Sequence, residues 1–414
     1  MEKEKNKERI PQLRFPEFKN TPAWKQRKLG EVAVSFSGGT PSIGNSKYYN
    51  GEIPFIRSAE INSAITELYL TEEGLKNSSA KMVNVGDILY ALYGATSGEV
   101  GISKINGAIN QAILAIKPYD AYNSKFIEQW LKNQKKNIID KYLQGGQGNL
   151  SAAIVKKLLI PFPSLPEQTA IGDFFSTLDR SIALHQRELE NLKNRKKSLL
   201  QKMFPKNGES VPKIRFPEFK NAPAWEQRKL GEVGITQSGI GFPDAEQGGK
   251  EGIPFFKVSD MNIIGNEFEM QSANNYVSKE QIERKNWKPI TSVPAIMFAK
   301  VGAAIMLNRK RLIRHPFLID NNTMAYIFDK TWDINFGKII FDTIYLPKYS
   351  QVGALPSYNG SDIENINVFM PNSLPEQKAI GDFFSTLDRS IALHQRKLEH
   401  LKLRKKALLQ KMFP

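Results

Sequence analysis

The stretch Ser164–Pro205, SLPEQTAIGDFFSTLDRSIALHQRELENLKNRKKSLLQKMFP, decides the fold because it occurs twice. It returns as Ser373–Pro414, with 37 of 42 positions identical. Apolar residues recur in alternating steps of four and three over about five heptads, which is the pattern of a coiled-coil seam. Ser164, followed three residues later by Glu167, predicts a capping box at the helix start, and the second copy repeats it. Each copy is therefore predicted to be a long helix that buries its apolar stripe against the other copy.

The seam is nearly symmetric about a midpoint near Glu190, which favours antiparallel pairing of the two helices. That register places His185 beside Lys405 and Lys196 beside His394. A neutral imidazole can accept a hydrogen bond from an ammonium group, and one polar layer can fix a register. The predicted seam residues are Leu178, Ile182, His185, Leu189, Leu192, Lys196, Leu199, Met203, Leu387, Ile391, His394, Leu398, Leu401, Lys405, Leu408 and Met412.

A second repeat lies upstream of each helix. The segment Pro11–Val32, PQLRFPEFKNTPAWKQRKLGEV, returns at Pro212–Val233 with 18 of 22 positions identical. The chain is therefore a tandem duplication whose period is too long for a solenoid, and it predicts a pseudo-two-fold molecule. The predicted parts are a first domain at 1–163 with a charged tail at 1–10, a helix at 164–205, a linker at 206–211, a second domain at 212–372 and a helix at 373–414.

Between the repeated segments the two halves differ in sequence but keep their order of apolar runs. Asp87–Tyr93 matches Pro294–Ala299, and Gly107–Ile116 matches Leu318–Ile327. Short apolar runs between Gly, Asn and Ser clusters predict strands, whereas the amphipathic pattern of Ser124–Leu143 predicts a helix. The expected fold class is α+β, with two mixed α/β domains separated by a long antiparallel coiled coil of two helices.

Charge and composition narrow the function. The net charge of +16 and the pI near 9.6 indicate an anionic partner, with nucleic acid first and a membrane surface second. The chain has no cysteine, which excludes disulfides and thiolate chemistry and suits a reducing cytosol. The N-terminal residues carry no apolar signal-peptide core, and no apolar run approaches the ~20 residues of a membrane span. We therefore expect a cytoplasmic protein.

The sequence offers little catalytic chemistry. It contains no GxxxxGK[ST] phosphate loop, no GxGxxG motif and no Asn-Pro-Pro-aromatic tetrapeptide of an amino-methyltransferase. No His, Asp and Glu cluster has metal-ligand spacing, and His185 and His394 are repeat equivalents on the seam. We predict a chain that is not an enzyme and that binds no metal or cofactor.

Polar loops in both halves suit recognition instead. Ser35–Gly51, Tyr90–Gly101 and Leu143–Ser151 combine glycines with hydroxyl and amide side chains, and basic residues gather near Asn321 in the second half. Arginine and amide side chains discriminate bases, whereas lysine mostly holds phosphates. The predicted DNA-contacting residues are Thr40, Ser42, Lys47, Tyr49, Arg57, Tyr93, Ser97, Gln111, Gln147, Asn149, Lys257, Lys300, Arg309, Arg311, Asn321, Tyr358 and Asn359.

The repeated segments of the two halves are nearly identical, whereas the segments between them differ in sequence. This contrast favours two domains of one architecture that recognise different targets. The alternative is a duplicated structural domain that has simply diverged.

These residues together resemble a known family, the specificity subunit of type I restriction-modification systems. The resemblance rests on WKQRKLGEV at Trp24–Val32, GGTP at Gly38–Pro41, GEIPF at Gly51–Phe55 and PSLPEQ at Pro163–Gln168, with partial repeats in the second half. The second half departs from this pattern at Ser238–Pro243, which reads SGIGFP in place of the Gly-Thr-Pro text.

The resemblance implies two target-recognition domains, each reading one half of a bipartite, asymmetric site in double-stranded DNA. It also implies that the helix pair sets the spacer and docks two methyltransferase subunits, which two restriction/translocase subunits then join. Methyl donor and ATP belong to those partners. A DNA-binding scaffold of a related modification or defence assembly with other partners remains an alternative.

Overall fold

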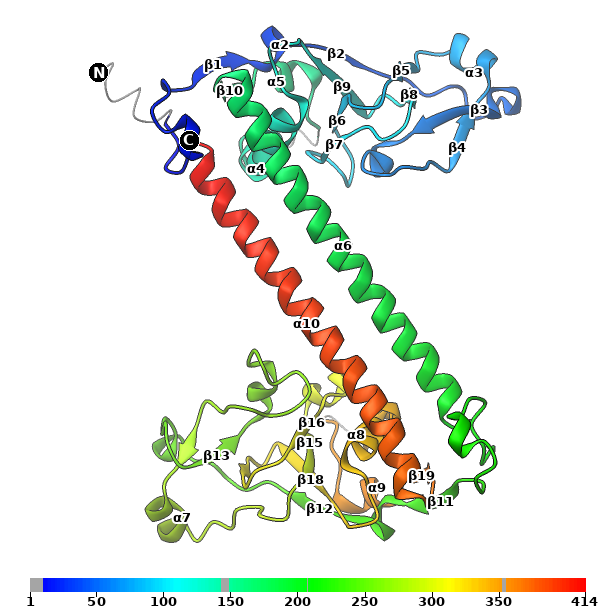
Figure 1. Cartoon of the computed structure of the whole chain (residues 1–414), viewed down its shortest axis with the longest axis vertical. Coiled ribbons are helices and arrows are strands. Elements are labelled where there is room, and N and C mark those ends of the chain that lie inside the picture. Colours follow the sequence, from blue (N-terminus) through cyan, green and yellow to red (C-terminus); the bar gives the residue numbers. More distant parts are fainter. Residues whose placement is uncertain (1–9, 143–148, 207, 352–354) are drawn as a thin grey trace. The chain divides into compact units, whose positions relative to one another are not determined.

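The computed structural model describes residues 10–142, 149–206, 208–351 and 355–414 (Figure 1). The chain divides into two compact units. The first unit comprises Met1–Leu184 and Leu398–Pro414, and the second comprises His185–Lys397. The two long segments 165–203 and 374–412 are therefore each divided between the two units.

The described residues of the first unit form three sheets. Strands β2, β9, β6 and β7 form an antiparallel sheet, and strands β4, β3, β8 and β5 form a mixed sheet in which β3 and β8 are parallel. A separate ribbon pairs β1 with β10. The bounds are β1 Lys25–Lys28, α2 Leu29–Val32, β2 Ala33–Ser37, β3 Tyr49–Ile56, β4 Leu68–Leu70, α3 Glu72–Lys76, β5 Lys81–Val83, β6 Ile88–Ala91, β7 Val100–Ile102, β8 Gly107–Ile109, β9 Ile113–Pro118, α4 Ser124–Tyr142, α5 Ala152–Lys156 and β10 Leu159–Phe162.

The second unit repeats this order. Its sheets are β12-β18-β15-β16, β14-β13-β17 and the ribbon β11-β19, and β13 and β17 are again parallel. The bounds are β11 Glu226–Lys229, β12 Gly234–Ser238, β13 Ile253–Phe256, β14 Tyr276–Val277, α7 Lys279–Lys285, β15 Ala295–Ala299, β16 Lys310–Ile313, β17 Leu318–Ile319, β18 Thr323–Phe328, α8 Ile334–Thr343, α9 Gly360–Glu364 and β19 Asn367–Met370. The two mixed α/β domains predicted from the apolar runs are confirmed.

One predicted run is two strands rather than one. Gly107–Ile116 contains β8 and β9, which belong to different sheets and are separated by a turn at 110–112. The matching run of the second unit is divided in the same way between β17 and β18. The amide-rich centre of each run, Asn110 with Gln111 and Asn321 with Asn322, lies where the chain passes between sheets.

The two long helices are α6 (Leu165–Met203) and α10 (Leu374–Met412) (Figure 1). In the first unit α10 runs antiparallel to α6, because Phe413 packs near Phe175 while Lys405 pairs with Asp179. The second unit shows the same direction, since Phe204 packs near Phe384 and Lys196 pairs with Asp388. The predicted antiparallel pairing is confirmed within each unit.

The predicted register is wrong. Lys405 Nζ lies 2.5 Å from Asp179, so Lys405 does not provide the expected partner for His185. Lys196 Nζ lies 2.6 Å from Asp388 and likewise does not pair with His394. The two histidines instead face each other, with their Nδ1 atoms 3.4 Å apart. The apolar seam left several staggers open, and a partly buried ammonium group is stabilised more by a carboxylate than by an imidazole.

A buried ion pair anchors the start of each helix to the repeated RFPEF segment. Arg14 binds Glu167, and Arg215 binds Glu376 at 2.6 Å; both carboxylate side chains are 1% exposed. Each arginine also donates to a backbone carbonyl three residues after the RFPEF segment, at Thr21 and Ala222. The glutamates assigned to capping boxes thus serve mainly as acceptors for buried arginines.

Replacing Glu376 with alanine is expected to destabilise the second unit by about 3–5 kcal/mol, because it leaves the buried Arg215 guanidinium without a counter-charge. Chemical denaturation of the full chain measures this loss. The control is Lys378→Thr, which places the residue of the first copy at an exposed ion pair and should leave the stability nearly unchanged, because exposed ion pairs contribute little. Equal losses for both variants would contradict the assignment.

Candidate nucleic-acid interface

In both units the loop that follows the first strand of the main sheet crosses a neighbouring backbone closely. A Cβ atom built on Gly38 would lie 1.8 Å from the Ile109 carbonyl oxygen, and one built on Gly239 would lie 1.8 Å from the Asp320 carbonyl oxygen. Only glycine fits at such an approach. The second unit therefore has a similar close crossing without the Gly-Thr-Pro sequence of the first.

The turn between the two sheets carries an amide side chain at equivalent positions. Asn110 N donates to Ile56 O in the first unit, and Asp320 N donates to Phe256 O in the second. The next residues, Gln111 and Asn321, are therefore structural equivalents, and both are exposed. Both were predicted from residue type alone, and the backbone hydrogen bonds now align them.

The residue after the parallel strand is basic in both units. Arg57 follows β3 and Lys257 follows β13, and their backbone N–H groups donate to Glu60 and Asp260. Asn110 and Asp320 donate to the carbonyls of Ile56 and Phe256, the residues directly before Arg57 and Lys257. These two cations therefore lie next to the amide turn. We call these segments the polar edge, which comprises 38–42, Arg57 and 110–112 in the first unit and 239–241, Lys257 and 320–322 in the second.

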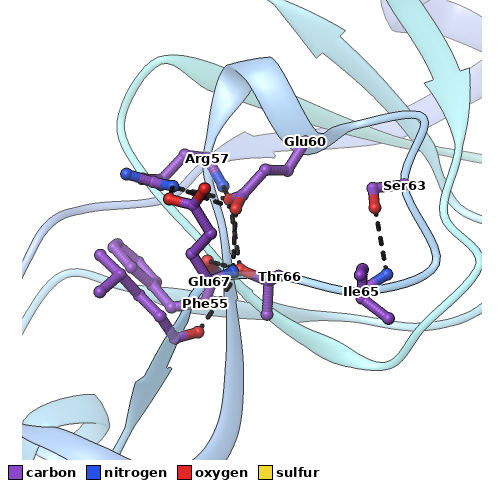
Figure 2. A network of polar contacts seen from close by, with 8 residues as sticks. Phe55, Arg57, Glu60, Ser63, Ile65, Thr66 and Glu67 are labelled. Atoms are coloured by element: carbon purple, nitrogen blue, oxygen red, sulfur yellow. Dashed lines mark hydrogen bonds and ion pairs between the residues drawn. The ribbon is translucent and has the colours of Figure 1, made fainter. Parts of the chain in front are cut away.

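Arg57 is held by carboxylates, as Figure 2 shows. Its guanidinium contacts Glu60 at 3.1 Å and also pairs with the exposed Glu67. Burial tends to raise the pKa of Glu60, but hydrogen bonds from Arg57 and from backbone N–H groups lower that pKa to about 2. Lys257 of the second unit has a neutral partner instead, since its Nζ donates to Gln247 at 3.2 Å. The cation of the first polar edge is therefore paired with carboxylates, whereas that of the second is hydrogen-bonded to a neutral amide.

Other predicted residues of the first unit gather at the same edge. Thr40 donates to Gln111, and Tyr49 Oη donates to Pro41 O at 2.8 Å. Leu92 N donates to Ala112 O, which brings the loop with Tyr93 and Ser97 against the amide turn. The segment with Asn149 joins through Leu150 N, which donates to Leu92 O. Ser42 and Lys47 are exposed on the loop after β2, and Gln147 lies outside the residues that the structure describes.

The second unit brings fewer of its predicted residues together. Lys300 joins the polar edge, since its Nζ lies 3.1 Å from Ser238 Oγ and its N–H donates to Asn322 O. Arg309 and Arg311 instead lie at β16, the outer strand of the sheet, where burial lowers the pKa of Arg311.

Two further predicted residues of this unit have structural surroundings. Tyr358 is buried against Phe298 in the core, and Asn359 caps the start of α9. A residue-type search cannot separate such side chains from those of a loop surface.

The sequence search missed a pair of basic grooves. The groove of the first unit is lined by α4 and the end of α10, and that of the second by α8 and the end of α6. Both grooves use the same six positions of the repeat, which carry identical residues in the two copies. These residues are Lys402, Lys405, Lys406, Leu409 and Gln410 of α10 with Phe413 directly after it, and Lys193, Lys196, Lys197, Leu200 and Gln201 of α6 with Phe204 directly after it. The repeat itself was the available signal.

Each unit thus has a polar edge whose side chains differ between the units and a groove to which the repeated helices contribute identical residues. No helix within the described residues has the length and apolar character to cross a membrane.

Comparison with known proteins agrees with this organisation. The family model described as "Type I restriction modification DNA specificity domain" matches residues 22–194 and 223–403. Two curated relatives from Methanocaldococcus jannaschii are similar over nearly their full lengths. The type I restriction enzyme MjaIX specificity subunit is 25% identical and covers 94% of this chain and 92% of its own, and the MjaVIII specificity subunit is 23% identical with 98% and 95% coverage.

A solved structure supports the fold. The type I restriction-modification S subunit from M. genitalium has a TM-score of 0.68 at 17% identity, with 98% of this chain and 99% of that chain covered. Each of the two matched segments of the family model spans one half of the duplication and overlaps both repeats found in the sequence. This chain therefore belongs to the type I restriction-modification DNA specificity domain family.

Proposed function

We propose that this chain is the DNA sequence-recognition subunit of a type I restriction-modification system, and that each polar edge reads one half of a bipartite, asymmetric site. The observation that carries this proposal is that the two units share a backbone arrangement but differ in the side chains of their polar edges. Gly38 and Gly239 both approach the backbone at the turn between the sheets closely, whereas the reading positions change from Arg57 and Gln111 to Lys257 and Asn321. Different side chains on one scaffold suit two different half-sites.

The chemistry of these positions fits the major groove. An amide side chain can bond the N6 and N7 atoms of adenine, and a basic side chain can bond the O6 and N7 atoms of guanine. The net charge of +16 favours the phosphate backbone and predicts affinity that falls steeply with salt. In the first unit, three segments form backbone hydrogen bonds with the amide turn or the residue directly before it and hold its backbone in place. The side chain of Gln111 nevertheless stays exposed.

The identical helix ends suit identical partners. We assign the recognition domains to 1–163 and 212–372, the helices to 164–205 and 373–414, and the linker to 206–211. The groove face presented once by α6 and once by α10 would dock two methyltransferase subunits, which two restriction/translocase subunits would join. The chain itself contributes recognition and no catalytic step.

Substituting the two amides separately tests the reading positions. Gln111→Ala should relax the methylated consensus in one half-site and Asn321→Ala in the other, each by about 1–3 kcal/mol of discrimination. Methylation mapping in cells that carry the complete system with each variant measures this change. Asn191→His, which copies the repeat-equivalent His400 onto an exposed helix position, is the control and should leave the consensus unchanged.

The expected outcome assigns one half-site to each unit. If either variant relaxed both half-sites, or if both weakened methylation evenly with an unchanged consensus, the polar edge would serve as a phosphate contact and the proposed reading role would fail.

A further inference from the structure

Three side chains of the second unit converge where its halves of the long helices face each other. His185 and Glu188 belong to α6, and His394 belongs to α10. His185 Nδ1 lies 3.4 Å from His394 Nδ1 and 3.4 Å from Glu188 Oε2. His394 Nδ1 lies 3.2 Å from the same Glu188 oxygen. Three good ligand atoms therefore form a nearly equilateral triangle.

The edges of this triangle match one metal geometry. With zinc–ligand bonds of about 2.0–2.1 Å, two ligands of a tetrahedral ion lie about 3.3–3.4 Å apart. An octahedral ion with bonds of about 2.1 Å brings adjacent ligands to about 3.0 Å. The observed edges of 3.2–3.4 Å fit the tetrahedral case, and two imidazoles with one carboxylate suit zinc in its ligand chemistry.

Hydrogen bonds alone satisfy this cluster poorly. Two neutral imidazoles bring at most two Nδ1–H protons to three facing atoms. If both protons pointed to Glu188, the two Nδ1–H groups would oppose each other across 3.4 Å. If His394 donated to His185, the Nδ1 lone pair of His185 would be occupied and Glu188 would lose one donor. A cation at the centre accepts all three lone pairs at once.

We propose that His185, Glu188 and His394 bind one Zn²⁺ ion, with water as the fourth ligand, and that the ion joins α6 to α10. Both imidazoles lie in the helix interface, with side chains 12% and 26% exposed, while Glu188 at 43% leaves a path for water. The sequence did not predict this site because its two histidines are 209 residues apart. Only the antiparallel packing brings them together.

The duplication makes the site asymmetric. The repeat equivalent of Glu188 is Lys397, one of the five positions at which the two helix copies differ. The pseudo-two-fold partner of the carboxylate is therefore a cation, so the cluster contains two histidines and a single glutamate. Lys397→Glu would supply a second carboxylate from α10, and Glu188→Lys would remove the first.

Metal titration of the full chain, in competition with a chromophoric chelator, tests the proposal. We expect one Zn²⁺ per chain, no binding of Mg²⁺, and a visible Co²⁺ absorption band of tetrahedral intensity. Glu188→Gln and Glu188→Lys should weaken Zn²⁺ binding at least about ten-fold, and Lys397→Glu should tighten it by a similar factor. His400→Asn, which copies Asn191 onto an exposed position of α10, should bind as the parent chain does.

Helix content measured by circular dichroism identifies variants that fail to fold, and Glu188→Gln is expected to keep it because its side chain is partly exposed. The proposal is overturned if the folded chain takes up no Zn²⁺. It is also overturned if Glu188→Gln and His394→Gln bind as tightly as the parent, or if His400→Asn removes the site.

Discussion

Replacing Phe413 with alanine is expected to destabilise the first unit by about 3–5 kcal/mol, although this residue is the last but one of the chain. Its ring lies 5.4 Å from Phe126, 6.1 Å from Trp24 and 6.2 Å from Phe175, measured between ring centroids. It is 5% exposed and belongs to the hydrophobic core of that unit. The first domain therefore depends on the end of a helix that follows the second domain in the chain.

The duplication supplies the matched variant. Phe204 after α6 packs with Trp225, Phe336 and Phe384 in the second unit, at 5.6–6.0 Å between centroids. Phe204→Ala should therefore lower the unfolding transition of the second unit, and Phe413→Ala that of the first. Leu403→Asn, which copies the exposed Asn194, should change neither.

Hydrogen exchange of the full chain, read separately for peptides of each unit, distinguishes these outcomes. The interlocked arrangement would be contradicted if Phe413→Ala loosened the peptides of the second unit instead of the first. The same packing restricts the replacement of the first domain by one from another protein, because the new domain must accommodate the ring of Phe413 in its core.

The sequence predicted the architecture correctly but not the register of the two long helices. Heptad spacing and the two repeats predicted two domains and two antiparallel helices, because an apolar stripe must be buried whatever its partner. The stagger depends on Asp179 and Asp388, which flank the seam and pair with Lys405 and Lys196. A pattern of apolar residues contains no information about such flanking charges.

The candidate interface was predictable in part. Gln111 and Asn321 were chosen because amides suit base edges, but their equivalence depends on backbone hydrogen bonds that join distant strands. Arg57 is predicted as a DNA-contacting residue from its type, and the structure shows that Glu60 and Glu67 bind its guanidinium. The equivalence of the two amides and the pairing of Arg57 both depend on contacts made in the folded chain, and residue type alone does not predict such contacts.

Lengthening both long helices by four residues is expected to add about two base pairs to the spacer of the recognised site. Each helix has 39 residues, and four more lengthen it by ~6 Å at ~1.5 Å per residue. Two base pairs rise by a similar ~6.8 Å. The insertions belong after Arg180 in α6 and after Arg404 in α10, on the same side of the Asp179–Lys405 pair, so that this pair and the core of the first unit are kept.

Four residues exceed one helical turn by only ~40°, which a helix pair absorbs by local unwinding. Methylation mapping of cells that carry the lengthened chain reads out the result directly, and both half-sites should persist with a longer spacer between them. An insertion in α6 alone is the control: it offsets the two apolar stripes, so methylation should be lost instead of moved. If the double insertion left the spacer unchanged while altering a half-site, the helix pair would not set the spacing, and the recognition domains would have to be positioned by the partner subunits.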